Sequence, residues 1–232
     1  MVSEYGRRVA EWGDPMTDAD RRQAAIDLLG VIAYAELTAF ERLAADASLA
    51  PTLDDKAALA AMAVTEFQHF QTLRDRLDSM GVDSTAAMAP FVEALDAYHD
   101  STTPADWLES LVKAYVGDGF AADFYREIAE FMDEPMQALV ADVLDDTGHA
   151  EFAVAHVRSA TEADPAVAGR LALWGRRLAG EALVQAQRIA VDRDELARLI
   201  VGGVGDLAEV GEMLARLTQR HSERMETLGL TS

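Results

Sequence analysis

Apolar residues recur at spacings of three and four along almost the whole chain, the period of a helix that buries one face. No segment alternates in the way that a half-buried β-strand would. The sequence therefore predicts an all-α protein. The predicted helices run over about 17–43, 54–81, 104–132, 135–157, 165–191 and 205–227.

A long connection separates the second and third predicted helices, with at most a short helix over 90–98. Short turns join the first helix to the second and the third to the fourth, so each pair forms an antiparallel hairpin. A long connection at mid-bundle lets the third helix run parallel to the second, as in ferritin-like four-helix bundles. We expect a single domain over 1–232. It would consist of a bundle over about 20–160, with two additional C-terminal helices over about 165–228 packed on it.

Four acidic residues occupy positions where the helical pattern calls for an apolar side chain. Two of them precede a histidine by three residues, a spacing that places both side chains on one face of a helix. About one acid-x-x-histidine pattern is expected by chance in this composition, and three are present. We interpret the third, which ends at His99, as a helix end with an exposed histidine. The six candidate residues are Glu36, Glu66, His69, Asp118, Asp146 and His149.

Carboxylates in a helical core are costly unless a partner compensates their charge. Four that converge on one core with only two histidines would repel each other strongly. Buried lysine or arginine is one remedy, but none falls in the same stripes of these four helices, and shared protons are another. A pair of metal ions is the simplest, and we predict all six candidates to be metal ligands. Carboxylate and imidazole donors suit iron, manganese or zinc.

Other side chains have a place near this predicted site. Tyr34, Tyr115 and Tyr125 lie on the same helices, although aromatic core packing is the commoner explanation for such residues. Asp142 stands one turn before Asp146, where it would support that residue or replace it as a ligand. For the ions themselves we expect Glu66 and Asp146 as bridges, with Glu36 and Asp118 as terminal ligands.

The formal net charge of −21 argues against nucleic acid or anionic lipid as a partner. The chain contains no cysteine, which excludes disulfides and thiolate ligands. No apolar run approaches eighteen residues, and the N-terminal segment lacks a signal-peptide core, so we expect a cytoplasmic protein with no membrane contact. The apolar residues of the C-terminal helices need cover from the bundle or from a second copy, which favours a homodimer.

The order of the six candidates resembles the ferritin-like di-iron carboxylate superfamily, whose pattern is Glu, Glu-x-x-His, Glu, Glu-x-x-His. Length and extra helices look like the branch of the tRNA-modifying monooxygenase that hydroxylates an isopentenyl-type adenosine. The sequence departs from the pattern at Asp118 and Asp146, which are one methylene shorter than glutamate. Gly148 also lowers helix propensity inside the second motif.

This resemblance implies an oxidoreductase that activates O2 on two iron ions, or on manganese or a mixed manganese–iron pair, to hydroxylate or otherwise oxidise an organic substrate. The substrate would be a small molecule or a modified nucleoside, and electrons would come from an external donor. Two alternatives stay open at this point. The first is a peroxide-scavenging or metal-handling protein of the same fold, and the second is a helical interaction protein with a degenerate metal site.

Overall fold

The computed structural model describes residues 16–145, 149–204 and 207–230, and for residues 149, 201–204 and 207–209 it describes the backbone alone. All regular structure in these residues is helical, as predicted. The first two bundle helices are α2 (Asp18–Asp46) and α3 (Leu53–Ser79). The third consists of α6 (Trp107–Val112), a π-helical turn (Lys113–Asp118) and α7 (Gly119–Ala129). The fourth consists of α8 (Glu134–Val143) and α9 (His149–Ala163).

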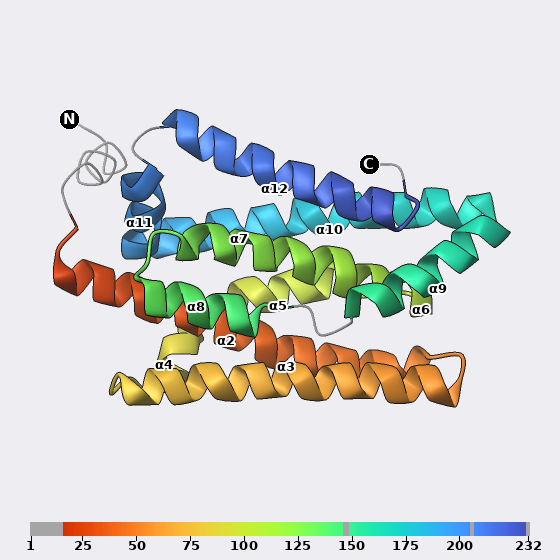
Figure 1. Ribbon diagram of the computed structural model, residues 1–232, viewed down its shortest axis with the longest axis horizontal. Coiled ribbons are helices and arrows are strands. Elements are labelled where there is room, and N and C mark those ends of the chain that lie inside the picture. Colours follow the sequence, from red (N-terminus) through yellow and green to blue (C-terminus); the bar gives the residue numbers. More distant parts are fainter. Residues whose placement is uncertain (1–15, 146–148, 205–206, 231–232) are drawn as a thin grey trace.

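The long connection between α3 and α6 crosses the bundle, so that α7 runs in the same direction as α3 (Figure 1). This confirms the crossover that the sequence predicts. The connection is more helical than expected, since it holds α4 (Ser84–Met88), a 3-10 turn (Ala89–Phe91) and α5 (Val92–Ser101). Helix α5 packs against α10, which follows it in the chain by more than sixty residues.

Side-chain caps fix the starts of the first hairpin. The Thr17 hydroxyl accepts a hydrogen bond from the backbone N–H of Asp20, whose carboxylate accepts one from the N–H of Thr17, which is a capping box. Thr52 caps α3 through the backbone N–H of Asp55. Gly81, with φ of 70°, supplies the left-handed residue that follows the end of α3.

Helix α2 is the central element of the core, and its residues 28–33 are almost wholly buried. The continuous helical segment Asp18–Leu49 is long and apolar enough to cross a membrane by those two criteria, with a mean hydropathy of 1.3. However, 61% of that apolar window is buried inside the protein, as a central core helix would be. Glu36 lies in this helix and is itself buried.

The C-terminal region contains α10 (Pro165–Asp192) and α12 (Leu207–Thr227), close to the two predicted helices, and a further helix between them, α11 (Asp194–Val204). Buried acids of the bundle pair with arginines of this region. Arg193 contacts Asp27, which is 1% exposed, through a 2.9 Å Nε–Oδ2 bond. On α12, Arg216 and Arg220 pair with Glu127, which is 2% exposed.

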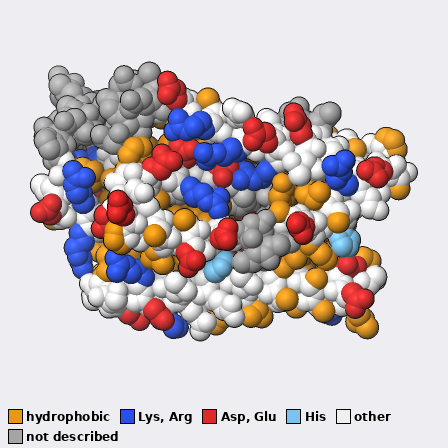
Figure 2. Space-filling view, in the orientation of Figure 1, with side chains coloured by type: hydrophobic (Ala, Val, Ile, Leu, Met, Phe, Trp, Pro, Cys, Tyr) orange, Lys and Arg blue, Asp and Glu red, His pale blue; other side chains and the backbone are white. Residues whose placement is uncertain are grey.

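Figure 2 shows basic and acidic side chains gathered together over the face that α12 and α7 form. Several apolar residues of the C-terminal helices are covered within the chain, namely Leu171, Leu178, Met213 and Leu217, whereas Leu173, Val184, Val191 and Leu214 are exposed. The homodimer stays a prediction.

The close approach of α2 to α4 depends on Gly30. A Cβ atom at this position would overlap the carbonyl oxygen of Ala87. We expect Gly30→Ala to lower the free energy of unfolding by about 1–2 kcal/mol, because overpacking outweighs the gain in helix propensity. The control is Gly180→Ala, an exposed position in α10 with open space, which should raise stability by up to about 1 kcal/mol. Urea denaturation followed by circular dichroism measures both, and equal effects would contradict this account.

Candidate metal centre

Three of the six predicted ligands meet at the middle of the α2–α3 hairpin. Glu66 and His69 lie one turn apart on α3, and Glu36 faces them from α2. The His69 Nδ1 atom is 3.4 Å from Glu36 Oε2 and 3.5 Å from Glu66 Oε2. One potential ligand atom from each residue lies within 4.8 Å of the other two. The helical i, i+3 spacing and the antiparallel hairpin therefore assemble half of the predicted site.

Burial and mutual repulsion set the ionisation of this cluster. Burial raises the pKa of Glu36 well above its usual value, and the neighbouring Glu66 carboxylate raises it further, while His69 opposes both effects. Interaction with Glu36, and then with Glu66, raises the pKa of His69 to about 10, against the effect of burial. In the absence of metal, the raised pKa values of Glu36 and His69 both favour retained protons, and a proton on His69 compensates the carboxylate charge that remains.

Asp118 faces the same space from the opposite side of the bundle. It lines a cavity of about 350 Å³ together with Glu36, Glu66 and His69. Asp118 is the last residue of the π-helical turn, and such turns are frequent at functional sites because the extra residue redirects the side chains that follow. Tyr125, one of the three tyrosines considered above, lines the cavity between the two halves. Burial raises its pKa, and the charges of Glu36 and Asp118 raise it further.

The remaining two predicted ligands, Asp146 and the side chain of His149, lie outside the described residues. The chain does reach the cavity at this point. Asp145, which follows the end of α8, lines it, whereas the alternative ligand Asp142 does not. The fourth helix is divided into α8 and α9, and the predicted continuous helix is wrong because α8 ends at Val143.

One compensating cation was missed by the stripe analysis, which found no lysine or arginine in the core of these helices. Lys113 is only 5% exposed, and its Nζ donates a 2.9 Å hydrogen bond to the carbonyl of Thr102. Burial lowers the pKa of Lys113 to about 8, and the nearby Asp118 charge acts in the opposite direction. The Asp118 half therefore has a protein cation close at hand, and this half departs from the expected arrangement in which metal alone compensates the acids.

The other histidines and tyrosines have distinct places. His156 lies within α9, and its Nε2 is 2.9 Å from Asp55 Oδ1 on α3. Tyr115 lines the cavity that Asp118 shares with Glu36, Glu66 and His69, which we call the metal cavity. The Tyr34 hydroxyl instead donates a 2.7 Å hydrogen bond to Asp96. The sequence analysis interpreted His99 as exposed, and this is wrong: His99 is buried, with 7% of its surface exposed.

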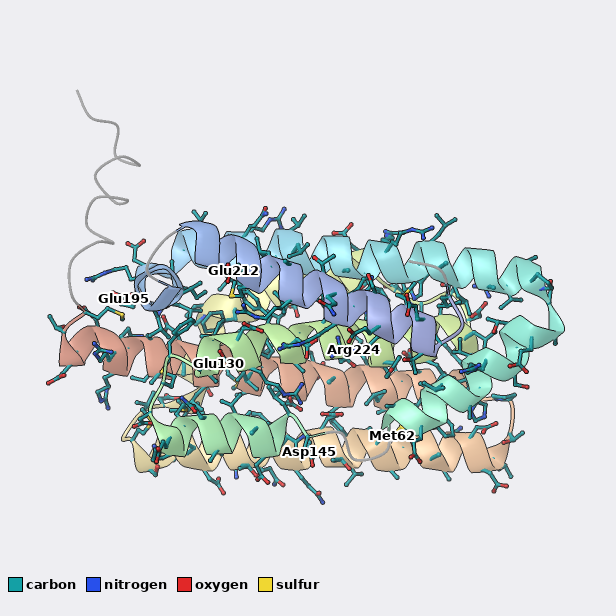
Figure 3. The ribbon with its side chains drawn as sticks, turned by 45° about the horizontal axis from the view of Figure 1, so that its top comes forward. Met62, Glu130, Asp145, Glu195, Glu212 and Arg224 are labelled. Carbon is teal, nitrogen blue, oxygen red and sulfur yellow. The ribbon has the colours of Figure 1, made fainter. Side chains whose placement is uncertain are left out.

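Two arginines at the cavity wall were not predicted. Arg126 comes from α7, and Arg224 reaches across from α12, with Nη1 2.7 Å from Asp123 Oδ2. Figure 3 shows Arg224 on α12 and Asp145 at the end of α8, both about midway along the bundle. Gly119, next to Asp118, makes room for Arg224, since a Cβ there would lie 2.6 Å from its Nε. Nothing in the local sequence around Arg224 signals this contact.

The donor set of the α2–α3 half fits a metal ion. Glu36 Oε2 and His69 Nδ1 are both buried, and neither makes a hydrogen bond of ordinary geometry among the described residues. Two carboxylates and one imidazole are the donors that iron and manganese take in four-helix bundles. The structure thus supplies one such group, with Asp118 across the cavity from it.

Comparison with known proteins agrees with this architecture. The family model described as "Ferritin-like domain, actinomycetes" matches residues 19–203, so the chain belongs to this ferritin-like family. Among solved structures, the chain is similar to a Synechococcus protein described as protein 19 with aldehyde deformylating oxidase activity. The two are 21% identical, the match covers 92% of this chain and 93% of that chain, and the TM-score is 0.69. This likeness shows the shared fold, and no curated protein matches.

Metal binding to this cluster should release a proton. Because the pKa of His69 is about 10 without metal, its imidazole is charged at pH 7 and must lose that proton to become a ligand. We expect at least one proton per chain to be released when manganese(II) binds at pH 7, from His69 and from whatever proton Glu36 retains, and the affinity to rise as the pH increases from 7 to 9. Calorimetric titration in two buffers of different ionisation enthalpy measures the proton count. A heat of binding independent of the buffer would contradict this prediction.

Proposed function

We propose that the protein is an oxidoreductase with a dinuclear non-haem metal centre, most simply di-iron, that uses O2 to hydroxylate or otherwise oxidise an organic substrate. The observation that carries the proposal is the buried group Glu36–Glu66–His69, which faces Asp118 across one cavity in a ferritin-like bundle. Asp146 and His149 would complete the ligand set. The bound ions would supply the reduction of dioxygen, with electrons from a separate donor.

The chain's own residues would prepare the site for this chemistry. Glu36 Oε2 and His69 Nδ1 are the atoms that would bind the metal, and both are buried without other hydrogen-bond partners. These two ligand atoms are therefore already desolvated and oriented. Tyr125 and several alanines line the cavity beside the acids. Arg126 and Arg224 place positive charge at the same wall, where it offsets part of the acidic field.

An organic substrate is favoured over peroxide scavenging by a second cavity, of about 100 Å³, whose lining is mostly apolar. It shares five lining residues with the metal cavity, so the two spaces adjoin. Small ligands bind in concave, largely apolar sites with a few polar groups, and this pair of cavities has that character. A protein that only destroyed peroxide or stored metal would have no use for an apolar space beside its acids.

Metal content and turnover test the proposal together. Protein loaded anaerobically with ferrous iron should hold about two ions per chain, and Glu66→Ala and Asp146→Ala should each lose metal. His156→Ala is the matched control, because it removes a helical histidine paired with an acid away from the cavity and should retain both ions. With a chemical reductant, the loaded protein should consume O2 faster than either ligand variant.

Other outcomes would assign the protein differently. Loss of a single ion in Asp146→Ala would show that the two halves bind metal independently. Rapid consumption of peroxide, with no O2 uptake, would favour the scavenging function. Absence of bound metal in the loaded wild-type protein, with the fold intact when all six candidates are replaced, would leave a helical interaction protein.

A further inference from the structure

The π-helical turn Lys113–Asp118 packs around a single side chain of α5, that of Tyr98. At the start of the turn, the Lys113 Nζ atom lies over the Tyr98 ring, 5.3 Å from its centroid. Near the end of the turn, the Tyr98 hydroxyl lies against the backbone of Gly117, because a Cβ atom at that position would be 2.5 Å from the hydroxyl oxygen. The Tyr98 side chain therefore contacts both ends of the turn, one residue before the proposed ligand Asp118.

Two hydrogen bonds hold Tyr98 and the start of the turn together. The Thr102 hydroxyl, at the end of α5, donates a 2.6 Å hydrogen bond to the backbone carbonyl of Tyr98. The backbone carbonyl of Thr102 accepts the 2.9 Å hydrogen bond from Lys113 Nζ. These two bonds, and the contact of the ammonium group with the Tyr98 ring, form a closed set of contacts. This set links the end of α5 to the first residue of the turn.

Packing, and not polar pairing, sets the position of the Tyr98 hydroxyl. Its oxygen is buried and makes no hydrogen bond of ordinary geometry among the described residues. Gly117 is buried as well. The contact between them is thus one of shape, and a residue with a side chain has no room at position 117 while the hydroxyl stays in place.

The π-helical turn sets the direction of Asp118. Such a turn contains one residue more than an α-helical turn, and successive residues of an α-helix differ in direction by about 100°. Without the extra residue, the Asp118 side chain would therefore be rotated by about 100° relative to α6. The turn lets α6 bury Leu111 and Val112 in the core while Asp118 lines the metal cavity.

We propose that Tyr98 is a positioning residue for the metal centre, because it maintains the π-helical turn and so directs Asp118 into the metal cavity. The proposal rests on the proposed function, in which Asp118 is a metal ligand. It gives a role in the site to a residue of the crossover connection, which lies outside the four bundle helices. Gly117 is the matching requirement, since only glycine leaves room for the Tyr98 hydroxyl.

Substitutions at this contact test the proposal in metal-free protein. In Gly117→Ala the added methyl group overlaps the Tyr98 oxygen, so the turn should shift and move Asp118. In Gly117→Ala/Tyr98→Phe that oxygen is gone, and the ring carbon Cζ would lie 3.8 Å from the methyl group, an ordinary contact. The 13C resonance of the Asp118 carboxylate, assigned through Asp118→Asn, should shift in the single variant and shift back in the double variant. Both variants carry the same alanine, so its direct effect on the resonance is common to both.

Gly30→Ala is the matched control. Its Cβ atom would also overlap an oxygen, the carbonyl of Ala87, but at the contact between α2 and α4. This variant should be destabilised and still keep the wild-type Asp118 resonance. If Gly117→Ala does not fold, Tyr98→Ala and Tyr98→Phe replace it. Both lack the hydroxyl, and the alanine variant, which also lacks the ring, should displace the resonance much further.

Manganese(II) binding, measured by equilibrium dialysis, gives a second readout. The wild type and Gly117→Ala/Tyr98→Phe should bind about two ions per chain, and Gly117→Ala about one. Fewer than two ions in the wild type would count against the proposed function, and the metal-free resonances would still decide the role of Tyr98. An unshifted resonance in Gly117→Ala, a shift that persists in the double variant, or an equal shift in Gly30→Ala would overturn the proposal. Retention of two ions by Gly117→Ala would overturn it as well.

Discussion

The burial of Glu36 in the central helix is the constraint on which the rest of the site depends. An ionised carboxylate in a core is tolerated only with a compensating charge and hydrogen-bonding partners. His69 provides that charge from the next helix, but only by retaining a proton that its ordinary pKa would not hold at neutral pH. Glu66 places a second carboxylate next to the same imidazole, with its Oε2 atom 3.5 Å from His69 Nδ1. The hairpin is therefore held in a state that a metal cation would relieve, which is why we regard it as a binding site and not as a structural ion pair.

The two halves of the bundle compensate the negative charge of their acidic residues in different ways. In the α2–α3 half, the acids and the histidine face each other directly. In the other half, Asp118 ends a π-helical turn that begins at Lys113, and the buried ammonium group of that lysine stabilises negative charge nearby. This asymmetry agrees with the replacement of glutamate by the shorter aspartate in that half. A carboxylate that already has a protein cation close by needs metal less, so the two proposed metal positions would differ in affinity.

Helical periodicity was enough to predict the bundle, its crossover and the Glu66–His69 pair, because a spacing of three residues fixes the relative direction of two side chains on a helix. It was not enough for features that depend on distant packing. His99 is buried on α5, a helix that packs against α10 far along the chain, and its imidazole contacts Thr38 of α2, whereas its short segment ends in polar residues that suggested exposure. Lys113 was overlooked because its long side chain reaches a backbone carbonyl from a position outside the stripe. Arg224 reaches the cavity from a helix that begins almost a hundred residues after α6, and no local pattern encodes such a contact.

Two histidines of one bundle show how strongly neighbours set the chemistry of a side chain. His69 faces two carboxylates, which raise its pKa to about 10 against the effect of burial. Burial is the main reason that the pKa of His99 is about 3, and the charges of Lys113 and Arg42 act in the same direction. The consequence is a division of roles between adjoining cavities. The first presents an acidic, proton-bearing cluster that suits a cation, whereas the second is lined mostly by apolar side chains and meets the first at Ala35, Ala39, Asp118, Ala121 and Tyr125.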